Sequence, residues 1–286
     1  MKKKPAKKQS RLLINVFGAP IIIATIIAGD NSFPFFSLFM LIVMLGCAYE
    51  VNTLLEKTKI KLSIPFIFTS VTLIQIFRSY DIFYNYIDEF IILLVTLSML
   101  YEMARSSSVH LLNISVLMFT FCWIGIGLGT SVDIRKIESY GVEYGLYIIL
   151  IIFLSVWLCD SAAYIFGKKF GKRKIASMIS PNKTLLGSTC GFLAVLFFLI
   201  SLYMYDLFYL RQICNENFFH LIALSIIFGI GSQFGDLVES LFKRDASIKD
   251  SGTILRGHGG FLDRFDSLLF VVPLSWIYIT NYLTHL

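Results

Sequence analysis

The segment YGLYIILIIFLSVWLCDSAAYIF, residues 144–166, decides the fold class of this chain. It contains a single charged side chain, Asp160, which lies towards its end. A helix that crosses a bilayer needs about 20 mostly apolar residues, and few of them carry charge. The segment therefore predicts a transmembrane helix.

The composition of the whole chain points the same way. Of its 286 residues, 56% are hydrophobic and 15% are charged, and the mean hydropathy is +0.74. Soluble domains average about 25% charged residues, so this chain has too little polar surface to cover a globule in water. We therefore expect an all-α, polytopic transmembrane helical bundle.

Further apolar stretches bring the expected number of spans to about nine. The predicted ranges are 12–29, 34–55, 62–77, 82–103, 109–129, 144–166, 184–207, 218–235 and 267–286. Their close spacing predicts a single membrane domain, residues 12–286, after a basic cytoplasmic tail, residues 1–11. The tail resembles the start of a signal peptide, but no clear cleavage site follows, so we expect the first span to be retained.

The basic residues predict the orientation of these spans. With the N-terminus inside, nine alternating spans place all but four of the 25 Lys and Arg residues on the cytoplasmic side. Such an excess is typical of cytoplasmic loops. We therefore attribute the net charge of +6 to orientation and to contact with anionic lipid or phosphate, and not to nucleic acid.

Two cytoplasmic loops, residues 167–183 and 236–266, carry most of the polar side chains that suit chemistry. Where the second begins, a helical spacing places Asp236, Glu239, Ser240 and Lys243 on one face. Carboxylates arranged in this way can hold Mg²⁺ and leave room for substrate phosphates. The alternative is a solvated amphipathic turn with internal charge pairs.

The same loop continues with a segment rich in glycine and charge. It contains Lys249-Asp250-Ser251-Gly252, then Gly257-His258-Gly259-Gly260, then Asp263-Arg264-Phe265-Asp266. Glycines let backbone amides approach phosphate oxygens, and Lys and Arg neutralise phosphate charge. Phosphate and metal binding therefore explains the segment better than solvation does. His258 suits either proton transfer and phosphate contact or hydrogen bonds within the loop.

Two features near the sixth and seventh spans extend the candidate site. Asp160 lies inside an apolar span, where an ionisable side chain is a functional candidate by default. Its alternative is a buried carboxylate paired with a loop lysine. Ser180 or Thr184 can cap the next helix, and Lys183 can reach a phosphate at its N-terminus, although this is also ordinary helix-start chemistry.

The run SLFKRDASIKDSGTILRGHGGFLDRFD, from Ser240 to Asp266, resembles the signature of the phosphatidate cytidylyltransferases, also called CDP-diacylglycerol synthases. The segments DSAAYIFGKKFGK, from Asp160 to Lys172, and SPNKTLLG, from Ser180 to Gly187, resemble two further segments of that family. The first 140 residues agree with it only in hydropathy and position.

The resemblance implies a multi-pass enzyme of phospholipid biosynthesis that joins CTP to phosphatidate, giving CDP-diacylglycerol and pyrophosphate. It implies Mg²⁺ as cofactor, with room for a second cation, and a site at the cytoplasmic face of the cell (inner) membrane. The implied partners are CTP, phosphatidate and membrane lipids, without nucleic acid, and a homodimer is left open.

The same resemblance assigns residues. It implies Asp236, Asp250 and Asp263 as metal ligands and catalytic carboxylates. It also implies Lys249 as a catalytic residue and Asp160, Lys183, Thr184, Lys243, Arg244 and Arg264 as substrate contacts. From the residues themselves we add His258 to the catalytic candidates and Ser240 to the substrate contacts.

Three positions depart from the family pattern, which has Lys, Glu and Pro where this chain has Asn182, Leu186 and Arg256. The missing acid at Leu186 is expected to weaken metal or nucleotide binding. Because the charged motif is otherwise intact, we expect a divergent active enzyme. Two alternatives stay open: a CTP-dependent lipid kinase of the polyprenol or phytol type, and a membrane transporter.

Overall fold

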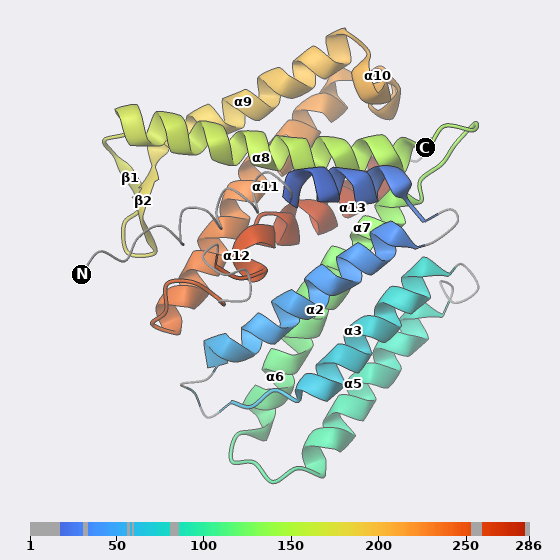
Figure 1. The fold of residues 1–286 in the computed structure, drawn as a ribbon, viewed down its shortest axis with the longest axis vertical. Coiled ribbons are helices and arrows are strands. Elements are labelled where there is room, and N and C mark those ends of the chain that lie inside the picture. The colour runs from blue at the N-terminus through green and yellow to red at the C-terminus, as the bar shows by residue number, and fades with distance from the viewer. Residues whose placement is uncertain are drawn as a thin grey trace. The chain divides into compact units, whose positions relative to one another are not determined.

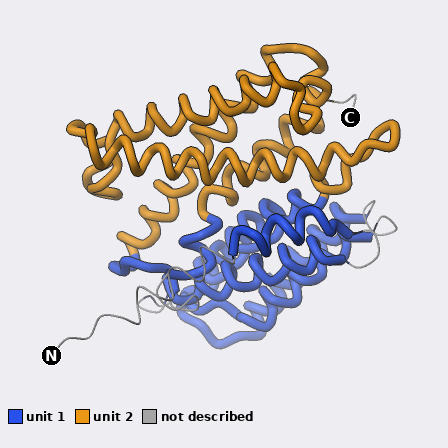
Figure 2. The backbone as a smooth tube through the Cα atoms, turned by 45° about the horizontal axis from the view of Figure 1, so that its top comes forward, with its two compact units in different colours: residues 1–132, 246–265 blue, residues 133–245, 266–286 orange. Residues whose placement is uncertain are grey.

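In a computed structural model of the chain, the described residues are 18–30, 34–55, 58, 60–80, 86–252 and 259–283. They form two compact units. Unit 1 takes Met1–Val132 and Ala246–Phe265, and unit 2 takes Asp133–Asp245 and Asp266–Leu286 (Figure 2). The predicted basic tail, residues 1–11, lies outside the described residues.

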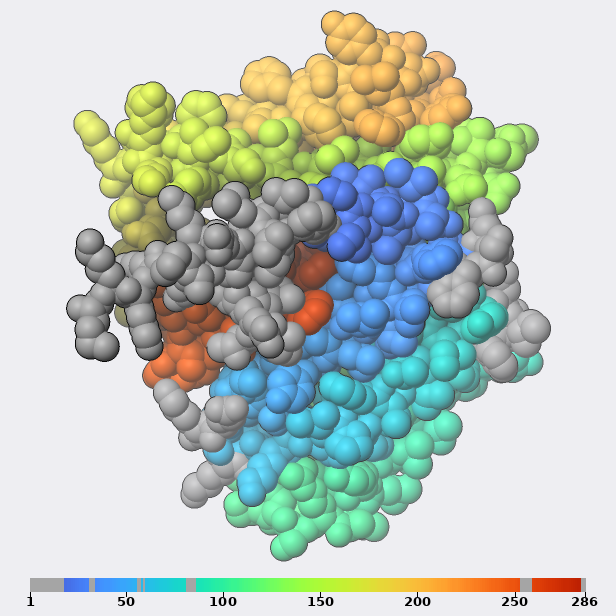
Figure 3. All heavy atoms as spheres, in the orientation of Figure 1, coloured from blue at the N-terminus to red at the C-terminus, as the bar shows by residue number. Residues whose placement is uncertain are grey.

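Unit 1 is built from apolar helices. An unlabelled helix over Gly18–Ala28 is followed by α2 (Phe35–Leu55), α3 (Ile64–Ser79), α5 (Ile87–Met103), α6 (His110–Thr120), the π-helix η1 (Phe121–Leu128) and the start of α7 (Gly129–Arg135). The short helix α12 (Leu262–Phe265) returns from far along the chain to pack on α2. The helices α2 and α3 lie against each other (Figures 1 and 3).

Unit 2 centres on three long helices. It contains α8 (Tyr144–Phe170), strands β1 (Lys174–Ala176) and β2 (Ser180–Thr184), α9 (Leu185–Met204), the short η2 (Leu207–Tyr209) and α10 (Leu210–Ile213), α11 (Phe218–Asp245) and α13 (Leu268–Tyr282). The helix α11 packs against α8, α9 and α13. This arrangement puts the polar end of α11 beside the turn that links α8 to α9.

Each of the nine predicted spans contains a helix, and the chain is an all-α membrane protein with little sheet. Among the described residues, five helices are long and apolar enough to cross a membrane: α2, the continuous helix His110–Arg135, α8, α9 and α11. Large apolar side chains such as Ile92, Leu111 and Phe197 are exposed on the helices, as expected where lipid is the solvent. Nine spans and a cytoplasmic N-terminus remain predictions.

The antiparallel hairpin of β1 and β2 was not expected from the sequence. Lys174 pairs with Thr184 and Ala176 with Ser180, with an irregularity between the two pairs. The hairpin extends from the adjoining ends of α8 and α9 (Figure 1). It therefore converts the predicted loop, residues 167–183, into an ordered element that presents Lys183 to α11.

Candidate functional site

The last two turns of α11 carry a polar face, as the helical spacing predicted. Ser240 Oγ donates to Asp236 Oδ1 over 3.3 Å, and Lys243 forms an ion pair with Glu239 one turn away. Glu239 is fully buried, and the Lys243 side chain is only 13% exposed. Charges this poorly solvated need a close counter-charge. The internal charge pair of the alternative interpretation is therefore present, but its two members are buried and not solvated.

Lys183 joins the hairpin to that face. Its ammonium lies 2.8 Å from Asp236 Oδ2 and donates to the carbonyl oxygen of Gln233 over 3.4 Å. Arg244 reaches the same hairpin, because its Nε donates to the carbonyl oxygen of Ile179 over 3.1 Å. The structure thus brings together three of the predicted phosphate contacts, Lys183, Lys243 and Arg244, around the end of α11.

Thr184 caps the N-terminus of α9. Its hydroxyl accepts a hydrogen bond from the backbone amide of Gly187 over 3.1 Å, which caps α9 at its first turn. The side chain is buried. Close packing of α8 on α9 surrounds it, since a Cβ on Gly187 would lie 2.6 Å from the carbonyl oxygen of Ala163. These contacts favour the capping interpretation of Thr184 over substrate contact.

Asp266 completes the acidic side of the cluster. Its carbonyl oxygen would be 2.4 Å from a Cβ at Gly235, so the glycine lets the chain before α13 approach α11. Carboxylate oxygens of Asp236, Glu239 and Asp266 all lie within 4.8 Å of one another. Burial, followed by the negative charges of Asp236 and Asp160, raises the pKa of the Asp266 carboxyl.

The balance of charge in this cluster suits a cation. Asp160, on α8, interacts electrostatically with Asp236 and Lys183. If Asp160, Asp236, Glu239 and Asp266 all ionise, the ammonium groups of Lys183 and Lys243 leave an excess of two negative charges. Clustered carboxylates resist ionisation unless a proton or a cation compensates them. A hard divalent ion with oxygen ligands therefore fits the residues present.

This cluster overlaps in part with the metal ligands that the resemblance implied. Asp236 belongs to both sets, and Glu239 shares with it the helix face that the spacing predicted, whereas Asp266 was not among the predicted ligands. The other two predicted ligands, Asp250 and Asp263, belong to unit 1.

Asp263 holds its own segment together. Its Oδ2 accepts hydrogen bonds from the backbone amides of Ser251, over 2.9 Å, and Gly260, over 2.8 Å, and lies 3.0 Å from Ser251 Oγ. Backbone amides that were expected to face phosphate thus face a carboxylate of the chain itself. Lys249, Asp250 and Arg264 are exposed, whereas His258 and Arg256 lie outside the described residues.

Glu50 was missed by the sequence analysis. It lies on α2, is fully buried, and accepts hydrogen bonds from the amides of Phe261, over 2.9 Å, and Leu262, over 2.8 Å, and from Ser251 Oγ, over 2.8 Å. The signal was available, because Glu50 is an ionisable residue inside a predicted span, as Asp160 is.

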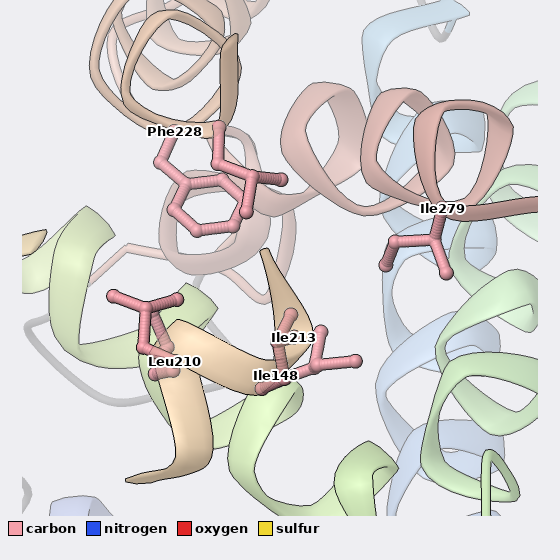
Figure 4. Close-up of a pocket in the computed structure, with 7 residues that line it drawn as sticks. Ile148, Leu210, Ile213, Phe228 and Ile279 are labelled. Atoms are coloured by element: carbon pink, nitrogen blue, oxygen red, sulfur yellow. The ribbon is translucent and has the colours of Figure 1, made fainter. Parts of the chain in front are cut away.

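An apolar pocket lies in unit 2, and none of its lining residues belongs to the polar cluster at the end of α11. It is lined by Ile148, Ile151, Leu210, Ile213, Leu224, Phe228 and Ile279 (Figure 4). The side chains come from α8, α10, α11 and α13. With no polar group in its lining, the pocket offers nothing to orient a charged substrate.

The sequence matches the model of the Cytidylyltransferase family over residues 9–282. A phosphatidate cytidylyltransferase of Staphylococcus haemolyticus (strain JCSC1435) is 34% identical over 269 residues, which cover 92% of this chain and 96% of that protein. A phosphatidate cytidylyltransferase of Staphylococcus epidermidis (strain ATCC 12228) is 36% identical over 242 residues, which cover 83% of this chain and 88% of that protein. A phosphatidate cytidylyltransferase of Staphylococcus aureus (strain COL) is 41% identical over 175 residues, which cover 61% of this chain and 62% of that protein.

Proposed function

Because this chain belongs to the cytidylyltransferase family, we propose that it is an enzyme that transfers CMP from CTP to phosphatidate. The products are CDP-diacylglycerol and pyrophosphate. The observation that carries the proposal is the polar cluster of Lys183, Asp236, Glu239, Lys243 and Asp266, at the end of a helix that is long and apolar enough to cross a membrane.

The reaction forms one bond and breaks one. A phosphate oxygen of phosphatidate attacks the α-phosphorus of CTP, and the bond from that phosphorus to the bridging oxygen breaks. Pyrophosphate leaves with the electron pair. A dianionic phosphate monoester is already a nucleophile, so the protein's main work is to position the two substrates and to neutralise charge.

The basic residues of unit 2 suit the triphosphate. Lys183 and Lys243 hold their ammonium groups next to carboxylates, from which each can turn to a phosphate oxygen. Arg244 is anchored through Nε to the carbonyl oxygen of Ile179, and the rest of its guanidinium can bind a phosphate. Ser240 keeps the Asp236 carboxylate oriented by its hydrogen bond.

The acidic residues suit Mg²⁺. Asp236, Glu239 and Asp266 would hold it, and their mutual proximity and excess negative charge support this assignment. When bound, Mg²⁺ supplies charge neutralisation for the phosphates of CTP. Asp160 adds negative charge from α8, and the exposed Lys249, Asp250 and Arg264 are further candidates for substrate contact.

The location of the cluster suits a lipid substrate. It lies at the end of α11, which is long and apolar enough to cross a bilayer, so a headgroup held there keeps its acyl chains in lipid. The distribution of Lys and Arg supports a cytoplasmic face for this end, where CTP is available.

The position of a radioactive label tests the reaction directly. The purified protein in detergent micelles with phosphatidate and Mg²⁺ receives CTP labelled at either the α- or the γ-phosphate. The proposal expects α-label in the lipid and γ-label in pyrophosphate. Transfer of γ-label to the lipid, with release of CDP, would overturn it in favour of a lipid kinase.

A further inference from the structure

Glu50 links α2 to a segment that lies about 200 positions later in the sequence. Its two carboxylate oxygens accept hydrogen bonds from the amides of Phe261 and Leu262, at the start of α12. The hydroxyl of Ser251 donates to the same carboxylate. Ser251, Phe261 and Leu262 are therefore all hydrogen-bonded to one side chain.

The glycines of the segment make room for this carboxylate. A Cβ on Gly260 would lie 1.9 Å from Glu50 Oε2, and a Cβ on Gly252 would lie 2.4 Å from Glu50 Oε1. Neither glycine has a positive φ. Their backbones would accept a side chain, so the space occupied by Glu50 is what requires glycine at these two positions.

The contact extends to Asp263. Ser251 Oγ lies 2.8 Å from Glu50 Oε2 and 3.0 Å from Asp263 Oδ2, and the Ser251 amide donates to Asp263. Thr53, one turn after Glu50, also donates to the carbonyl oxygen of Ser251 over 2.5 Å. Through Ser251, the position of Glu50 thus determines where the Asp263 carboxylate lies.

We infer that Glu50 is a positioning residue that holds residues 251–252 and 259–263, next to the charged residues Lys249, Asp250 and Arg264, in the conformation used by the enzyme. The inference rests on the proposed function. Fixing the segment before substrate binds removes an entropy cost that binding would otherwise meet. The contacts support a positioning role, because the amides of Phe261 and Leu262 and the hydroxyl of Ser251 all donate to the Glu50 carboxylate.

The test compares Glu50→Gln with Glu89→Gln, which makes the same change at an exposed position of α5. In Glu50→Gln, an NH₂ group replaces one of the two carboxylate oxygens. A donor then faces a backbone N–H of Phe261 or Leu262, and that hydrogen bond is lost. We expect faster hydrogen exchange in peptides covering residues 259–263, while α8 and α9 keep their protection. We also expect a KM for CTP about 10-fold higher and a kcat/KM about 10²-fold lower.

The KM distinguishes positioning from bulk stability. A fraction of unfolded enzyme lowers the apparent kcat and leaves KM unchanged, whereas a displaced segment raises KM. An unchanged KM for CTP together with unchanged exchange at 259–263 would overturn the inference. If the wild type makes no CDP-diacylglycerol, the proposed function fails, and the exchange data still decide whether Glu50 orders the segment.

If Glu50→Gln does not fold, a second test introduces a steric clash at Gly260 and then relieves it with a shorter acid at position 50. Gly260→Ala places its Cβ on the Glu50 carboxylate, so we expect it to raise exchange and the KM for CTP. Adding Glu50→Asp, which shortens the acid, should recover part of both. The control, Gly231→Ala, meets only Val271 and Leu274 at 3.6 and 3.8 Å. Additive losses in the double variant would contradict the proposed contact.

Discussion

The ammonium of Lys183 lies 2.8 Å from Asp236 Oδ2, which ties the end of β2 to the polar face of α11. One residue comes from a polar loop and the other from the end of an apolar helix. The two charges neutralise each other. A triphosphate and a divalent cation could replace both halves of this pair, the phosphate at Lys183 and the cation at Asp236.

Replacing Lys183 should therefore weaken CTP binding in particular. We expect Lys183→Met to raise the KM for CTP about 10-fold, equivalent to about 1.4 kcal/mol, with a smaller effect on the KM for phosphatidate. Lys174→Met is the matched control, since Lys174 is exposed on the same hairpin. Steady-state kinetics in mixed micelles measure both constants, and equal effects of the two substitutions would argue against a specific phosphate contact.

The end of α11 was predictable from the sequence because its contacts are local. Residues four apart on a helix lie next to each other regardless of the tertiary surroundings. The pairs of Asp236 with Ser240 and of Glu239 with Lys243 therefore follow from spacing. The helical character of all nine predicted spans has the same origin in local hydropathy. The short hairpin was missed because its polar residues show neither alternation nor a strong turn signal.

The rest of the site depends on contacts between distant parts of the chain. Asp266 joins Asp236 only because Gly235 allows a close backbone approach. Helical spacing pointed to Glu239 beside Asp236, whereas the family resemblance implied Asp250 and Asp263, and neither pointed to Asp266 as a ligand. Glu50 itself could have been selected as an ionisable residue inside a predicted span. Its hydrogen-bond donors could not, because they lie more than 200 positions away.

Metal dependence should follow the acidic cluster. We expect chelation by EDTA to abolish activity and Mg²⁺ to restore it. In Asp266→Asn, the Mg²⁺ concentration for half-maximal activity should rise about 10-fold, because one carboxylate ligand is lost. The control, Asp206→Asn, changes an exposed acid between α9 and η2. Identical Mg²⁺ titrations for the two variants would contradict the assignment of Asp266 to the metal.

The buried pair of Glu239 and Lys243 should affect stability as a unit. Glu239→Gln removes the charge that compensates a Lys243 side chain only 13% exposed, and we expect a loss of about 3 kcal/mol in the free energy of unfolding. Adding Lys243→Met removes the stranded charge and should restore part of that loss. SDS titration of the protein in mild detergent measures the change. A double variant less stable than Glu239→Gln would refute this account of the pair.

Thr184 should behave as a helix cap. Thr184→Ala removes the acceptor for the Gly187 amide, and we expect it to cost about 1 kcal/mol of stability. Thr184→Ser keeps the hydroxyl and should lose less. The same SDS titration compares the two variants. If the two are equally stable while both raise the KM for CTP, Thr184 contacts substrate and the capping interpretation is wrong.

The most direct test of the central claim is CTP-dependent conversion of phosphatidate by the purified protein with Mg²⁺, beside Asp236→Asn and Asp245→Asn. Asp245 ends the same helix and is exposed. The account predicts CDP-diacylglycerol and pyrophosphate from the wild type and from Asp245→Asn. It predicts at least about a 10²-fold loss in Asp236→Asn. Absence of product from the wild type, or full activity in Asp236→Asn, would contradict it.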